Sequence, residues 1–120
     1  MNLKIHKINQ NTIVELISDQ QIINDVQDSL DLMADAGEYD SDKIIIYERN
    51  LSPDFFRLST GIASEILQKF STYTKQLAII GDYAKFSSKS LKDFIYESNK
   101  TGRILFITSL EEALEKLSRN

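Results

Sequence analysis

Apolar residues along the chain fall into two patterns: short runs of strand length, and stripes with helical spacing. The runs cover residues 3–8, 12–17, 43–48, 76–81 and 103–108. The first two are joined by a short polar segment, which predicts an antiparallel pair. The continuous apolar run from Ile44 to Tyr47 is typical of a central strand that helices cover on both faces, or on most of both.

Between these runs, apolar residues recur every three or four positions, as they do on the buried face of an α-helix. Ser18–Gln21 matches the capping-box pattern, in which a serine hydroxyl and a glutamine side chain satisfy backbone groups of the first turn. We therefore expect the first helix to begin there, to carry Ile22 and Ile23 on its buried stripe, and to end at Gly37.

Three further helices are expected. Ser52–Asp54 predicts a brief helical turn bearing two phenylalanines, and a longer helix follows over residues 60–73. Ser87 or Ser88 would cap the third helix and Ser109 the fourth. The order β-β-α-β-α-β-α-β-α predicts an α/β fold with a single mixed sheet of about five strands and four main helices. With 120 residues, we expect one domain over residues 1–120.

Composition restricts the setting of the protein. The chain has no cysteine, which excludes a disulfide framework, a thiolate nucleophile and a cysteine-based zinc site. Its formal net charge of −4 argues against binding to DNA or RNA, because nucleic acids select strongly basic surfaces. The first residues lack the apolar run of a signal peptide, and no later run has the length needed for membrane insertion. We expect a cytoplasmic protein.

The residues assign no catalytic group, no metal ligand and no cofactor. The only histidine, His6, lies in an expected edge strand without a nucleophile beside it, and we interpret it as a solvent-facing or locally bonded ring. No glycine-rich loop is present to hold a phosphate. A solvated acidic helix face explains a series of aspartates better than a cation site does: Asp25, Asp28, Asp31 and Asp35. These observations favour a non-catalytic protein, although they leave enzymatic activity undecided.

The carboxyl ends of the inner strands are the place where open α/β sheets commonly bind ligands. The polar residues expected there are Glu48, Arg49, Asp82, Tyr83 and Ser109. Aromatic residues accompany them, and these are equally suited to the core: Phe55, Phe56, Tyr83 and Phe86. One functional alternative is therefore a small-molecule or lipid-binding domain, with weak enzymatic activity left open, whose candidate pocket comprises Phe55, Phe56, Asp82 and Tyr83.

Hydroxyl side chains stand at the expected start of the second helix, where Ser59 and Thr60 precede Gly61. A phosphate on either hydroxyl would be stabilised there by free backbone amides and the helix dipole, and would add up to about two negative charges. The simpler interpretation is an ordinary N-cap, with Gly61 allowing close packing.

Two resemblances follow from these residues. The element order and the run from Phe55 to Leu67 resemble the anti-sigma-factor-antagonist (STAS) pattern, in which an aspartate-serine-serine-glycine-leucine run opens the second helix. Ser59, Thr60 and Gly61 occupy the serine-serine-glycine positions, and Leu58 replaces the aspartate. Over nearly its whole length the chain is also similar to an uncharacterised bacterial family, domain of unknown function 4180, in residues 23–28, 30–34, 60–63, 65–70, 88–99 and 109–114.

The STAS resemblance implies a regulatory, non-catalytic domain that docks a protein partner through its second helix and the loop before it. Ser59, Thr60 and Gly61 are the candidate regulatory and interaction residues in this interpretation, with Ser59 or Thr60 as the site of a phosphate switch. The resemblance to the uncharacterised family implies no activity. The sequence leaves homo-oligomerisation open.

Overall fold

The computed structural model describes residues 1–119, and within them the elements follow the expected order. The strands are β1 (Leu3–Ile8), β2 (Asn11–Leu16), β3 (Lys43–Tyr47), β4 (Gln76–Ile80) and β5 (Ile104–Ile107). The α-helices are α1 (Val26–Gly37), α2 (Ile62–Thr72), α3 (Lys89–Thr101) and α4 (Leu110–Leu117). Three short 3-10 turns connect β3 to α2, namely η1 (Glu48–Asn50), η2 (Pro53–Phe56) and η3 (Leu58–Thr60).

The five strands form one mixed sheet whose spatial order, β1-β2-β3-β4-β5, is the order of the chain. β1 pairs with β2 in antiparallel register through a turn at Asn9 and Gln10, both of which have positive φ. The other three pairings are parallel, with α1, α2 and α3 as the connections. The predicted α/β class with a single five-stranded mixed sheet is confirmed.

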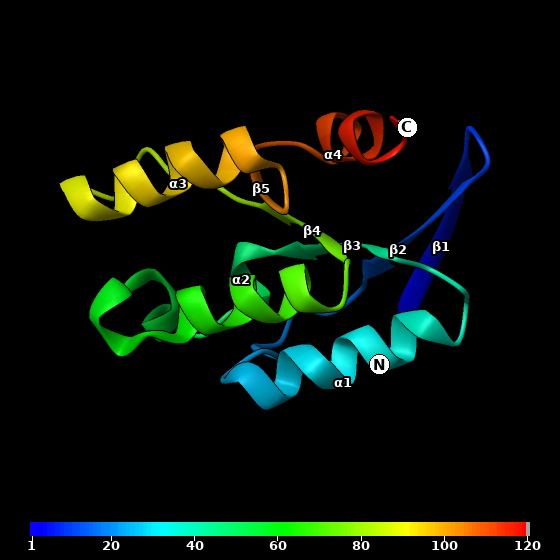
Figure 1. The fold of residues 1–120 in the computed structure, drawn as a ribbon, viewed down its shortest axis with the longest axis horizontal. Coiled ribbons are helices and arrows are strands. Elements are labelled where there is room, and N and C mark those ends of the chain that lie inside the picture. Colours follow the sequence, from blue (N-terminus) through cyan, green and yellow to red (C-terminus); the bar gives the residue numbers. More distant parts are fainter. Residues whose placement is uncertain (120) are drawn as a thin grey trace.

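The two faces of the sheet are covered unequally (Figure 1). The larger core packs α1, α2 and α3 against one face and includes the fully buried rings of Phe55 and Phe70. On the other face α4 alone packs against the strands, through Ala113 and Leu117. Since α4 is short, the part of this face near β1 has no helix over it (Figure 1).

The expected start of the first helix is wrong. α1 begins at Val26, and its N-cap is Asp25, whose carboxylate accepts the Asp28 amide at 3.0 Å. The segment before it does not join the helix, because the buried side chain of Asn50 donates to the carbonyl oxygens of residues 18 and 20, while the main-chain carbonyl of Asn50 accepts the amides of residues 22 and 23. Ser18 therefore closes only a local turn, with its hydroxyl accepting the Gln20 amide at 3.0 Å.

Candidate functional site

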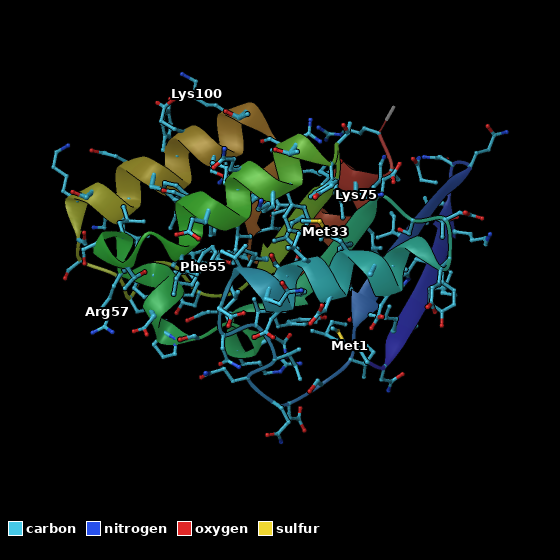
Figure 2. All side chains as sticks on the ribbon, turned by 60° about the horizontal axis from the view of Figure 1, so that its bottom comes forward. Met1, Met33, Phe55, Arg57, Lys75 and Lys100 are labelled. Atoms are coloured by element: carbon cyan, nitrogen blue, oxygen red, sulfur yellow. The ribbon has the colours of Figure 1, made fainter. Side chains whose placement is uncertain are left out.

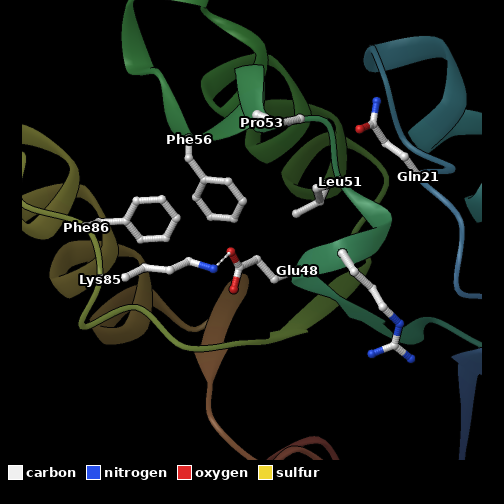
Figure 3. A pocket seen from close by; sticks show the side chains of 8 residues that line it. Gln21, Glu48, Leu51, Pro53, Phe56, Lys85 and Phe86 are labelled. Carbon is white, nitrogen blue, oxygen red and sulfur yellow. Dashed lines mark ion pairs between the residues drawn. The ribbon is translucent and has the colours of Figure 1, made fainter.

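The loops that follow β3 and β4 meet at the carboxyl ends of these strands and enclose a pocket of about 300 Å³ (Figure 3). Four of its lining residues are polar and four are apolar: Gln21, Glu48, Arg49 and Lys85, with Leu51, Pro53, Phe56 and Phe86. The volume lies at the lower end of the range for small-molecule sites. The lining combines one carboxylate with two cations on an apolar floor, so it can accommodate a small ligand with an apolar body and a polar end.

Glu48 is the most constrained polar group of this pocket. Its Oε2 pairs with the Lys85 ammonium (Figure 3), and its Oε1 accepts the Asp82 amide at 3.3 Å. A Cβ on Gly81 would lie 2.7 Å from that Oε1, which is closer than real Cβ contacts. Glycine at position 81 therefore allows the close approach that brings Glu48 beside the β4 loop.

An aromatic cluster forms the wall of the pocket on the α3 side. The rings of Phe56 and Phe86 stack with centroids 4.9 Å apart and an interplanar angle of 19° (Figure 3). Tyr83 lies beside both rings, and its hydroxyl donates to the Ile79 carbonyl. Burial raises the pKa of Tyr83, and the Glu48 charge raises it further, so this tyrosine stays neutral and supports the wall from behind.

The structure separates the four residues of the sequence-derived candidate pocket. Phe56 lines the pocket, whereas the Phe55 ring points into the core and is 1% exposed. Asp82 and Tyr83 stand behind the lining: Asp82 donates its amide to Glu48, and its own carboxylate accepts the Ala84 amide at 3.1 Å. Ser109, also expected at these strand ends, is the N-cap of α4.

Several lining residues were not anticipated. They come from three separate parts of the sequence, and no local pattern links these parts: Gln21, then Leu51 with Pro53, then Lys85. Asn50 was also missed: it is 0% exposed and holds the segment that carries Gln21 against the η1 turn. An asparagine inside a charged stretch gives no sequence signal of this kind, because its role depends on burial in three dimensions.

The residues before α2 form a fixed turn. The Thr60 hydroxyl lies 2.7 Å from the Asp54 carbonyl oxygen and 2.9 Å from the Arg57 carbonyl oxygen, so it acts as a donor inside the turn. Ser59 beside it is exposed. Arg57 pairs with the Asp54 carboxylate and projects from the same loop (Figure 2). One short turn thus carries an exposed hydroxyl two residues after an exposed cation.

Gly61 has a different role from the expected close packing. It is the N-cap of α2 with φ of +79°, and no side chain caps the helix at this residue. A Cβ there would meet nothing closer than 3.6 Å, so the left-handed backbone conformation, rather than lack of space, favours glycine.

A second polar group lies on the face of the sheet that α4 covers. Glu15 is 4% exposed, its Oε1 lies 2.9 Å from His6 Nε2, and its Oε2 accepts the Tyr47 hydroxyl at 2.7 Å. Burial and the Glu15 carboxylate raise the pKa of Tyr47 to about 12. The Arg49 guanidinium stacks over the Tyr47 ring, 4.3 Å from its centroid. This network ties β1, β2 and β3 together.

The aspartates of α1 serve local roles. Asp25 is the N-cap, Asp28 accepts the Asn24 amide, and Asp31 accepts from Gln27. Within residues 1–119, no three histidine, cysteine or acidic residues are arranged to hold a metal ion. In the same range, no helix combines the length and the apolar character needed to cross a bilayer.

Comparison with known proteins gives one decisive result. Residues 8–117 match the sequence profile of the family described as domain of unknown function (DUF4180). The chain belongs to this family. No curated protein matches it in sequence. Among solved structures, it is similar to a Thermotoga maritima protein described as an anti-sigma factor antagonist, with 13% sequence identity, a TM-score of 0.47, and coverage of 98% of this chain and 95% of that chain.

The DUF4180 assignment confirms the family resemblance stated from the sequence. The description of the Thermotoga maritima protein names the other group that the sequence resembles, the anti-sigma-factor antagonists. The family description names no activity, so a function for this chain has to be argued from its own residues.

Proposed function

We propose that this DUF4180 protein is a non-catalytic interaction domain. It would bind a protein partner through the loops at the carboxyl ends of β3 and β4, with Ser59 as a hydroxyl whose phosphorylation switches binding. The observation that carries this proposal is the exposed Ser59 on a fixed turn, two residues after the exposed Arg57 and directly before α2.

Side-chain hydrogen bonds near both ends of this turn fix its conformation, which lowers the entropic cost of binding a partner. The Ser52 hydroxyl accepts the Asp54 amide at 3.1 Å, and the Thr60 hydroxyl donates back to the same short segment. Phe55 and Phe56 anchor the segment in the core. A loop that is already ordered loses little conformational freedom when a partner docks on it.

Ser59 and Thr60 differ as modification sites. A phosphate on Thr60 would remove the donor that closes the turn and would disrupt the loop. A phosphate on Ser59 leaves that donor in place and adds negative charge beside Arg57 and close to the amino-terminal end of α2. Of the two hydroxyls considered from the sequence, we therefore assign the switch to that of Ser59.

A site-specific photo-crosslinker at position 59, used in the native cells, tests the proposal. The matched control carries the same crosslinker at Lys100, which is exposed on α3. We expect one protein to crosslink stoichiometrically from position 59 and not from position 100. With the crosslinker moved to Ser64, an exposed residue in the first turn of α2, we expect Ser59→Asp, but not Ser59→Ala, to change the yield of that protein at least about tenfold. Equal labelling from both positions, or no effect of Ser59→Asp, would contradict the proposal.

One observation favours a second candidate, a small-molecule-binding domain. The pocket of about 300 Å³ beside Glu48 has an apolar floor and a charged rim in the position where open α/β sheets bind ligands. Its occupant would place an apolar body against Phe56 and Phe86 and a polar group near Lys85. A lipid or another small molecule with an apolar body fits this description.

Thermal-shift screening of amphipathic metabolites tests this candidate, because a ligand that binds only the folded state raises the melting temperature. A shift that is lost in Gly81→Ala, whose added Cβ forces Glu48 away, would locate the ligand in the pocket. Gly37→Ala is the matched control, because nothing lies within 4 Å of a Cβ at that position. If no compound raises the melting temperature, or if both variants keep the shift, the pocket is not the binding site.

A further inference from the structure

The two edge strands of the sheet differ in whether other groups of the chain bond to their outer backbone. The outer edge of β5 is closed by α3: the Asn99 side chain accepts the Phe106 amide at 2.7 Å and donates to the Phe106 carbonyl at 3.3 Å. The Ser98 hydroxyl donates to the Ile104 carbonyl at 2.6 Å. These side chains take the place of a neighbouring strand, so β5 offers little backbone to another chain.

β1 has a ladder on one side only. Directly opposed residues of an antiparallel pair alternate between exchanging backbone hydrogen bonds and not exchanging them. The Ile17 amide donates to the Asn2 carbonyl, which makes that pair a bonded one. Counting along the register, the main-chain groups of Leu3, Ile5 and Lys7 therefore point away from β2. Figure 1 shows β1 at the side of the sheet opposite to α3, with no other element beyond it.

The side chains along this open edge are apolar and basic. Ile5 is 40% exposed, and Lys4 and Lys7 are exposed. β1 contains no acidic residue. Glu15, which lies opposite Lys4 in the register, already binds His6 and Tyr47. The edge is thus a positively charged strip on a protein of net charge −4.

We infer that the outer edge of β1 is a second binding surface, which takes an extended acidic segment of a protein partner as a sixth strand. Outward main-chain groups of β1 would supply the hydrogen bonds, as in known cases of strand addition. Alternate residues of the segment would be apolar beside Leu3 and Ile5, and acidic on the face that carries Lys4. This surface lies apart from the loops of the proposed function.

Charge decides between this occupant and a second copy of the chain. Pairing β1 with β1 of another molecule would bring lysines of both strands together, because the strand holds only basic charges. Like charges on paired strands are destabilising, and lysine on an edge strand opposes self-association. An acidic segment from a different protein meets neither obstacle.

The first experiment titrates the isotope-labelled full chain with a short peptide of alternating glutamate and valine, followed by NMR. We expect shifts concentrated on β1 and slower hydrogen exchange of the outward amides of Leu3, Ile5 and Lys7. The same peptide with lysine in place of glutamate is the control and should not bind. Shifts elsewhere, equal binding of both peptides, or no binding at millimolar peptide would overturn the inference.

Two variants sharpen the result. Ile5→Pro removes an outward N–H and leaves the β1–β2 ladder intact, because proline is tolerated where the N–H of an edge strand faces solvent. The charge variant Lys4→Glu/Lys7→Glu keeps the backbone and reverses the charge. We expect each to weaken peptide binding at least about tenfold, whereas Lys92→Glu on α3 should not. Undiminished binding by the charge variant, or concentration-dependent dimers of the parent chain through β1, would overturn the inference even if Ile5→Pro fails to fold.

Discussion

β1 and β5 are both edge strands of one sheet, but they are attached by different forces. β5 is buried along its whole length, its Phe106 ring packs near three other aromatic rings, and α3 side chains satisfy its outer backbone. β1 is largely exposed and is joined to the rest by its ladder with β2 and by the His6–Glu15–Tyr47 network. The outer backbone of β5 is thus bonded to side chains of the same molecule, whereas the outer backbone of β1 is available to a partner.

This difference separates the surfaces that stabilise the fold from those that can bind. Aromatic packing at β5 contributes stability because it removes a large apolar area from water. At β1, the His6–Glu15–Tyr47 network satisfies one buried carboxylate. The main-chain groups of β1 that point away from β2 lie on the outer side of the sheet. A strand of the second kind can accept a partner without any unfolding of the core.

The largest expected difference comes from truncating one side chain in the middle of each edge strand. Phe106→Ala removes a nearly buried ring and should lower the free energy of unfolding by about 3–5 kcal/mol. Ile5→Ala, at the 40% exposed position of β1, should cost less than about 1 kcal/mol. Urea unfolding of both variants measures the difference. Similar losses would show that the two edges are equally important for stability.

The second-largest effect concerns the α3 side chains that bond to the outer backbone of β5 and so close this edge. Asn99→Ala leaves the Phe106 amide and carbonyl without their partners, and should lower the free energy of unfolding by about 1–3 kcal/mol. It should also open the edge, so we expect the variant to self-associate at high concentration, as seen by analytical ultracentrifugation. Asn24→Ala is a control on an exposed asparagine outside the sheet. A monomeric Asn99→Ala protein of parent stability would refute the closure.

The smallest effect is a pH dependence at the β1 side. The pKa of Tyr47 is raised from 10.0 to about 12, so the folded state holds this proton more tightly than the unfolded state does. The stabilisation is complete below pH 10 and is lost as the pH rises to about 12. Tyr47→Phe should therefore lose less stability than the parent across this window. Because Tyr83 also has a raised pKa, part of the decline remains in the variant.

Unfolding free energies at several pH values, compared between the two proteins, measure this difference directly. Alkaline loss of lysine charge affects both proteins alike and cancels in the comparison. Parallel curves for the parent and for Tyr47→Phe would show that the Tyr47 proton is not coupled to folding.

The sequence predicted the elements whose signals are local. Hydrophobic runs located all five strands, and the Ser88 and Ser109 caps are in place, with each hydroxyl accepting an amide of the first turn. The predicted start of α1 was wrong because a local sequence pattern and a contact with a distant residue favour different structures for the same segment. Ser18–Gln21 has the capping pattern, but buried Asn50, distant in the sequence, holds that segment outside the helix.

The candidate site was predicted less completely for the same physical reason. The element order places the ends of β3 and β4 together, so Glu48 and Arg49 were expected near a crevice and do line the pocket. The direction of each side chain depends on tertiary packing: neighbouring Phe55 and Phe56 point to the core and to the pocket respectively. No spacing rule distinguishes two adjacent phenylalanines in a 3-10 turn.

The strand order has a consequence for how the molecule is made. Because spatial order repeats chain order, each strand that emerges during synthesis finds its neighbour already present. The sheet can grow from its amino-terminal side, one strand and helix at a time, and α3 with its Asn99 is complete before β5 arrives. The growing edge is then sealed as the last strand docks, and the edge that was made first is the one that stays open.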